Sequence, residues 1–125
     1  MIRFTIHLPP ITKKNSQQIM VNKTTGKPFV MPSKRYKEYE AMALWYIPRV
    51  VKPIDFPVNI QCLFFMETRR KCDLTNLLEA ADDIMVKSGL LSDDNYTIIH
   101  SHDGSRVYYD KDNPRTEICI TKIGR

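Results

Sequence analysis

One nine-residue run limits the fold more than any other feature of this sequence. From Val58 to Met66, apolar side chains stand at every second position, which is the period of a β-strand. Leu63 and Phe65 add apolar side chains to the opposite face. A strand that is apolar on both faces belongs in the interior of a sheet. We therefore expect a sheet with this run as a central strand.

Other segments predict the strands around this central one. Pro10 closes the first alternating segment, and Gly26 lies where a hairpin turn is expected. Residues 11–18 are polar and are expected to form a loop, and turn residues gather at 103–104 and 110–114. The expected strands are 2–8, 19–22, 28–31, 95–102 and 116–123.

Two segments with helical spacing complete the predicted elements. A helix is expected over 34–47, capped by Ser33 and stopped by Pro48. A second helix is expected over about 74–88, with Gly89 after its last turn. The chain has 125 residues, which fits one domain. We predict a single α+β domain over 1–125, a mixed β-sheet with two main helices packed on it.

Charge is divided unevenly along the chain. Residues 1–71 contain 13 Lys and Arg against 4 Asp and Glu, a net charge of +9, and residues 72–125 contain 6 against 10, a net charge of −4. A basic half joined to an acidic half favours a polyanionic partner together with a bound divalent cation. Chance segregation of surface charge is the alternative, and charge alone leaves both open.

Cysteine usage and hydropathy bear on location. Cys62, Cys72 and Cys119 are odd in number and lack CxxC spacing, so neither disulfides nor a zinc site is expected. No apolar run approaches the roughly 18 residues that a membrane span requires. The alternating N-terminus is unlike a signal peptide. These features predict a cytoplasmic protein without a membrane partner.

Acidic residues gather over 22 positions directly behind the basic run that begins at Arg69. On a helical wheel of about 100° per residue, Asp73, Asn76 and Asp83 form a polar line opposite the apolar arc. A solvated helix face with Asp73 as the N-cap would look similar. The preceding basic run and the adjacent like charges of Asp82 and Asp83 favour a metal site instead.

The ordered set of short motifs resembles the RusA-type Holliday-junction resolvases. Their pattern is a basic run, Asp-x-Asp-Asn-Leu, another Asp along the helix, and then Gly and an Asp-Asp pair before a strand. The matching segments are Arg69-Arg-Lys-Cys-Asp73-Leu-Thr-Asn76-Leu, Ala80-Ala-Asp-Asp83 and Gly89-Leu-Leu-Ser-Asp93-Asp94. The first strand, its closing prolines and the polar loop containing Asn15 also fit the pattern.

The resemblance implies a homodimeric endodeoxyribonuclease that depends on Mg2+, with Mn2+ as a substitute. Such enzymes cut two strands across a four-way DNA junction in recombination and repair. A bacterial cytoplasm is the expected setting, and family members are often carried by phages and prophages.

The resemblance and the chemistry together assign expected roles. Asp73, Asp83 and Asp94 are the expected catalytic residues. The expected metal ligands are Asp73, Asp94, Asp93 and Glu79, because magnesium prefers carboxylate oxygens. The residues expected to bind DNA are Arg69, Arg70, Lys71, Lys13, Lys14, Asn15 and Asn76, most of which can contact phosphates.

Two positions depart from the resolvase pattern. The second motif Asp falls on Thr75, a poor metal ligand, and the lysine that follows falls on Glu79. Glu79 lies one helical turn after Thr75 and can restore the lost carboxylate. Thr75 also motivates the alternative function, a branched-DNA-binding protein with weak or no cleavage. Flaps or replication forks are alternative substrates.

Overall fold

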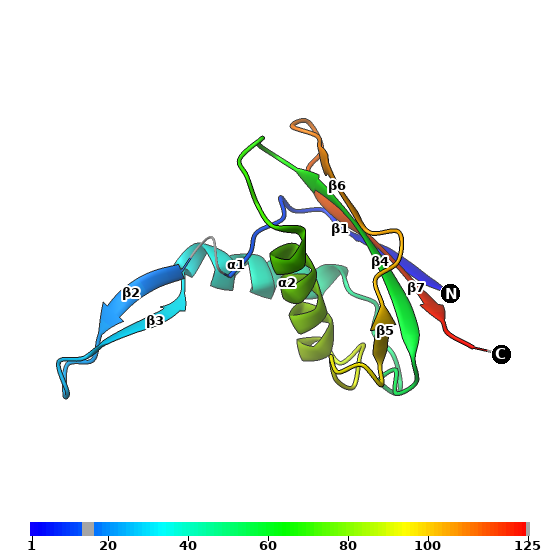
Figure 1. Ribbon diagram of the computed structural model, residues 1–125, viewed down its shortest axis with the longest axis horizontal. Coiled ribbons are helices and arrows are strands. Elements are labelled where there is room, and N and C mark those ends of the chain that lie inside the picture. Colours follow the sequence, from blue (N-terminus) through cyan, green and yellow to red (C-terminus); the bar gives the residue numbers. More distant parts are fainter. Residues whose placement is uncertain (14–16, 125) are drawn as a thin grey trace.

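The sheet at the centre of the fold is built around β4 (Val58–Met66), as the alternating run predicts. A computed structural model describes residues 1–13 and 17–124 of the chain. β4 pairs antiparallel with β7 (Arg115–Lys122), which pairs antiparallel with β1 (Ile2–Ile6). On its other edge β4 pairs in parallel with β5 (Ile99–Ser101) and β6 (Arg106–Tyr109). The result is a mixed five-stranded sheet with β4 in its interior (Figure 1).

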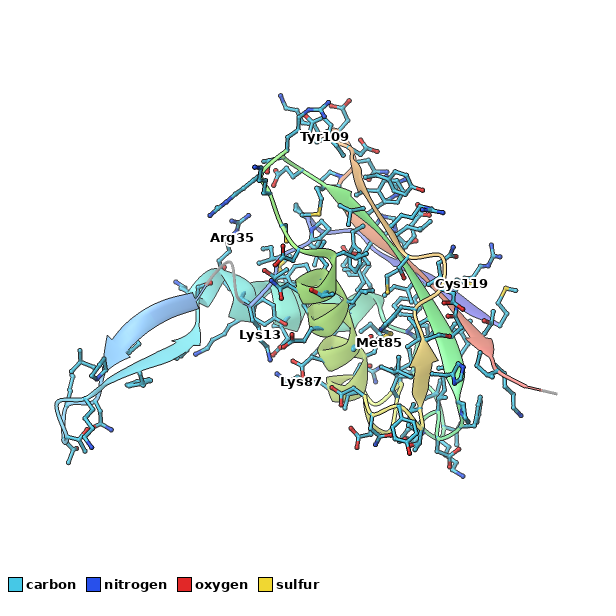
Figure 2. The ribbon with its side chains drawn as sticks, viewed as in Figure 1. Lys13, Arg35, Met85, Lys87, Tyr109 and Cys119 are labelled. Carbon is cyan, nitrogen blue, oxygen red and sulfur yellow. The ribbon has the colours of Figure 1, made fainter. Side chains whose placement is uncertain are left out.

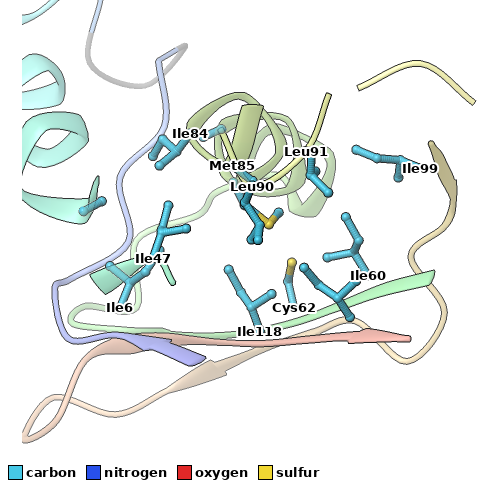
Figure 3. Close-up of a cluster of buried hydrophobic side chains, with 14 of the residues drawn as sticks. Ile6, Ile47, Ile60, Cys62, Ile84, Met85, Leu90, Leu91, Ile99 and Ile118 are labelled. Carbon is cyan, nitrogen blue, oxygen red and sulfur yellow. The ribbon is translucent and has the colours of Figure 1, made fainter. Parts of the chain in front are cut away.

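The hydrophobic core lies between one face of this sheet and the two helices. Val58, Ile60, Cys62 and Phe64 are all buried along one side of β4. Figure 3 shows their neighbours from α2 and the segment after it, including Met85, above the sheet. Burying this apolar surface is the main stabilising term for such a fold.

The first helix, α1 (Lys34–Ala43), begins where it was predicted and ends earlier. The backbone N–H of Tyr36 donates to Ser33 Oγ at 3.2 Å, which confirms Ser33 as the cap. The chain then tightens into a 3-10 turn, η2 (Leu44–Tyr46). Ile47 is extended, because the following proline disfavours helical backbone at the residue before it.

The second helix, α2 (Leu74–Lys87), carries the acidic residues and packs its apolar side on the sheet. Its buried residues are Leu77, Ala80, Ala81, Ile84 and Met85. The chain leaves α2 through Gly89, whose φ of 86° favours glycine. The N–H groups of Leu90 and Leu91 then donate to the Met85 carbonyl and turn the chain back toward the sheet.

A hairpin formed by β2 (Gln17–Val21) and β3 (Pro28–Pro32) is a separate two-stranded sheet. The hairpin confirms the prediction around Gly26, although β2 starts within the segment expected to be a loop. It extends away from the main sheet (Figure 1). We call this hairpin the arm.

The region after α2 differs most from the prediction. The expected strand over 95–102 shortens to β5, because the Asn95 carbonyl accepts hydrogen bonds from the Ile98 and Ile99 N–H groups and forms a turn. β6 was not predicted at all: its four residues are all exposed, so its sequence carries no burial pattern. The small mixed-sheet domain with two helices is nevertheless the α+β fold expected. Among the described residues, no helix is long and apolar enough to cross a membrane.

Candidate active site

The outer side of α2 forms one wall of a small hollow of about 90 Å3. The hollow is lined by Lys13, Asn76, Glu79, Ala80, Asp83 and Asp94, and we call it the acidic hollow. Residues 76, 79 and 83 share a helix face because they are separated by three and four positions. Asp94 comes from the loop after α2, and Lys13 comes from the segment after β1, beside α2 in Figure 2. Three separate segments of the chain therefore meet at this point.

Asp83 is held between two lysines. Its Oδ2 atom lies 2.8 Å from Lys13 Nζ and 3.5 Å from Lys87 Nζ. Lys87 also contacts Glu40 of α1 at 2.9 Å. Burial alone would raise the pKa of Asp83, but the two ammonium groups bring that pKa below its ordinary value. The Asp83 carboxylate is thus an ion-pair partner of both lysines.

Asp82 points to a different partner from its neighbour Asp83. Its Oδ2 atom lies 2.9 Å from His102 Nε2, and His102 Nδ1 lies 2.8 Å from the Ile60 carbonyl oxygen. Burial raises the pKa of Asp82, and the bond to Asp82 raises the pKa of His102 although burial opposes that shift. The like charges of Asp82 and Asp83 are therefore offset by separate protein partners, which the sequence did not indicate.

The adjacent acids Asp93 and Asp94 take different positions. Asp93 accepts hydrogen bonds from the Asp94 N–H at 2.7 Å and from Asn95 Nδ2 at 3.0 Å, and the first of these lowers its pKa. Those bonds fold the loop, and Asp93 does not line the acidic hollow. Asp94 does line it. The metal role predicted for Asp93 stays a prediction.

Asp73 occupies the N-cap position of α2, but its side chain makes no capping hydrogen bond. Its Oδ2 atom instead lies 3.5 Å from Nδ2 of Asn76, a residue of the acidic hollow. Asp73 itself is exposed and is not among the lining residues. The structure thus connects Asp73 to the hollow through Asn76.

The donor chemistry of the acidic hollow suits a hard cation. Among the described residues, no three His, Cys, Asp or Glu side chains are grouped closely enough to form a ready metal cage. Magnesium needs no such cage, because it keeps several waters and usually takes one or two carboxylates. The carboxylates of Glu79, Asp83 and Asp94 supply that donor type, whereas a structural zinc site would require nitrogen or sulfur ligands.

A second hollow, of about 180 Å3, has a basic rim. Arg70 and Lys71 line it together with Arg35 of α1, and we call it the basic hollow. Consecutive residues, Thr12 and Lys13, line the basic and the acidic hollow, so the two are neighbours. Sequence reasoning missed Arg35, because nothing in the local pattern of α1 shows that it faces residues 70–71.

The remaining bases expected to contact DNA are placed less uniformly. Arg69 lies over the ring of Tyr109, with its guanidinium carbon 4.1 Å from the ring centroid. Lys14 and Asn15 lie outside the described residues.

A mixed α+β domain with carboxylates converging beside a basic surface has the features of a nuclease of the phosphodiester-hydrolysing class. A family model described as endodeoxyribonuclease RusA matches residues 8–121. The chain is also 31% identical over 88 residues to the crossover junction endodeoxyribonuclease RusA of Aquifex aeolicus (strain VF5). That match covers 69% of this chain and 66% of the relative, just under two thirds of its length. The chain belongs to the RusA family of endodeoxyribonucleases, as its motifs predict.

Proposed function

We propose that this protein is a Mg2+-dependent, structure-specific endodeoxyribonuclease that cuts Holliday (four-way) junctions in recombination and repair. The observation that supports this most is the meeting of Asp94 with Glu79 and Asp83 in the acidic hollow. Glu79 and Asp83 lie on α2 and Asp94 lies in the loop after it, so packing of the core brings Asp94 to the other two. Membership of the RusA family points to the same chemistry.

Hydrolysis requires water oxygen to bond to phosphorus while the bond from phosphorus to one sugar oxygen breaks. The sugar oxygen takes the electron pair and a proton, and the attacking water loses one. A bound magnesium ion would acidify a water ligand and neutralise charge on the phosphate. Asp94, Glu79 and Asp83 would hold such an ion, and Asp73 could contribute across Asn76. Asn76 would position a phosphate oxygen through its amide.

The presence of Glu79 favours an enzyme that cleaves branched DNA over a protein that only binds it. Thr75 removes a carboxylate from the resolvase pattern, and Glu79 lines the acidic hollow. We infer that Glu79 replaces the missing ligand.

The bases of the neighbouring hollow would hold the DNA backbone. Arg35, Arg70 and Lys71 can contact phosphates, and such contacts orient DNA without reading sequence. Recognition of a junction by its shape requires no base-specific side chain.

Two symmetric cuts require two active sites, so we propose a homodimer. The arm supports this, because isolated hairpins are marginally stable in water. It also exposes Met20, Val21 and Phe29. A second copy of the chain covering these side chains would stabilise it. Sedimentation analysis should give a dimer that Val21→Asp weakens.

Cleavage of a synthetic four-way junction tests the proposal. We expect cutting with Mg2+ or Mn2+, none with EDTA, and little on linear duplex. Asp94→Asn should abolish cutting while the junction is still bound. Tight binding without cutting in either metal would identify a junction-binding protein instead. Equal cutting of forks or flaps would broaden the substrate class.

A further inference from the structure

Lys13 occupies a position that a surface anchor for DNA would not require. Its Nζ atom lies 2.8 Å from Asp83 Oδ2, and its side chain retains 35% of its exposure. The ammonium group is also 5.8 Å from the centroid of the buried Tyr36 ring. At that distance the face of an aromatic ring attracts a cation. The side chain is thus held over α2, with its charge at the acidic hollow.

The balance of charges in the acidic hollow indicates a role for Lys13. Among the described residues that line it, Lys13 is the only cation, against the carboxylates of Glu79, Asp83 and Asp94. A DNA phosphate brings further negative charge into the same space. Repulsion would oppose its approach unless cations at that point offset it. Lysine can follow the phosphate, since its ammonium sits on a flexible four-carbon stem.

Asp83 can release Lys13 without losing every ion-pair partner. Lys87 remains 3.5 Å from the same Oδ2 atom and does not line the hollow. Lys13 is therefore the lysine of this pair that can turn toward a substrate.

We propose that Lys13 is a catalytic residue whose ammonium moves from Asp83 to the phosphate being cut and stabilises the charge that develops there. This rests on the proposed nuclease function. Lys13 makes and breaks no covalent bond and transfers no proton. Its contribution is electrostatic stabilisation of the transition state, and removing one such donor typically costs roughly 100- to 1,000-fold in rate.

The test compares Lys13→Gln with Lys87→Gln, which removes the other lysine beside Asp83. Single-turnover cleavage of a four-way junction is measured in Mg2+ with saturating enzyme, and junction affinity is measured separately without divalent metal. Thermal unfolding confirms that each variant folds, and Lys13→Met is a second neutral variant if glutamine impairs folding.

We expect the Lys13 variants to lose roughly 100-fold or more in rate. Their dissociation constant should change by less than about tenfold. Lys87→Gln should stay within about fivefold of the wild-type rate, as for other solvent-accessible ion pairs.

Several results would overturn the proposal. Weakened binding with an unchanged saturated rate would make Lys13 a backbone anchor. Equal losses in the Lys13 and Lys87 variants would show that neutralising Asp83 is what matters. An unchanged rate and affinity in the Lys13 variants would mean that Lys13 only forms a static ion pair with Asp83. A wild-type protein that binds junctions without cutting them would instead remove the nuclease function, and this role with it.

Discussion

The pair formed by Asp82 and His102 should make the stability of this protein fall as pH rises above neutrality. Both neighbours of His102, the Asp82 carboxylate and the Ile60 carbonyl, accept hydrogen bonds. Neutral histidine has one N–H donor, so both contacts are satisfied only when the pair holds an additional proton. The raised pKa values of His102 and Asp82 agree with this.

The size of the stabilisation that this pair provides follows from the burial of its side chains. His102 retains 21% of its exposure and Asp82 retains 15%. Solvent therefore screens the pair only weakly. A hydrogen bond to a charged group contributes about 1.5–3 kcal/mol, and the bond to Ile60 adds about 1 kcal/mol. His102→Ala should lower the free energy of unfolding by about 2–4 kcal/mol at about pH 6.

Urea unfolding of a double-mutant cycle provides the assay. The variants are His102→Ala, Asp82→Ala and the double variant, with His100→Ala, an exposed histidine in β5, as the control. The folded pKa of His102 lies above its ordinary value of 6.5, so the coupling is strongest between the raised pKa of Asp82 and that pH. It is lost as pH rises through the folded pKa. A coupling energy below about 0.5 kcal/mol at about pH 6, or one that grows as pH rises above neutrality, would refute the reasoning.

Three further predictions concern the site and its supports. Asp94→Asn should reduce junction cleavage far more than Asp93→Asn in a single-turnover assay, and equal losses would contradict the placement of only Asp94 in the hollow. Arg70→Gln should weaken junction binding and reduce the slope of log affinity against log salt by about 0.9, whereas an unchanged slope would mean no phosphate contact. Gly89→Ala should lower unfolding free energy by about 1–2 kcal/mol in urea titration, from backbone strain alone, since a Cβ there would meet no atom within 4 Å. No change in that titration would contradict the strain.

The parts of the fold that sequence predicts are those with a strong local pattern. β4 alternates over nine residues, and α2 combines an apolar arc with a terminal glycine, so their predicted limits agree closely with the structure. β6 has no such pattern, because it is an exposed edge strand positioned by pairing with β4. β5 is short because a turn at Asn95 uses backbone groups that a longer strand would need.

The candidate site likewise contains some residues whose placement the local sequence pattern predicts and others whose placement it does not. Helical spacing is enough to align Asn76, Glu79 and Asp83 on one face. The contribution of Asp94 and Lys13 depends on where two loops return to α2, which is decided by packing of the core. The separation of Asp93 from Asp94 depends on hydrogen bonds within one loop, which no residue pattern reveals.

The position of a bound manganese ion tests the central claim most directly, because it shows which carboxylates form the metal site. Crystals of the protein soaked in Mn2+ would locate the ion by anomalous scattering. We predict an ion in the acidic hollow, bound by Asp94 and by at least one of Glu79 and Asp83. An ion bound elsewhere, for example on Asp93 without any ligand from the hollow, would contradict the proposed active site.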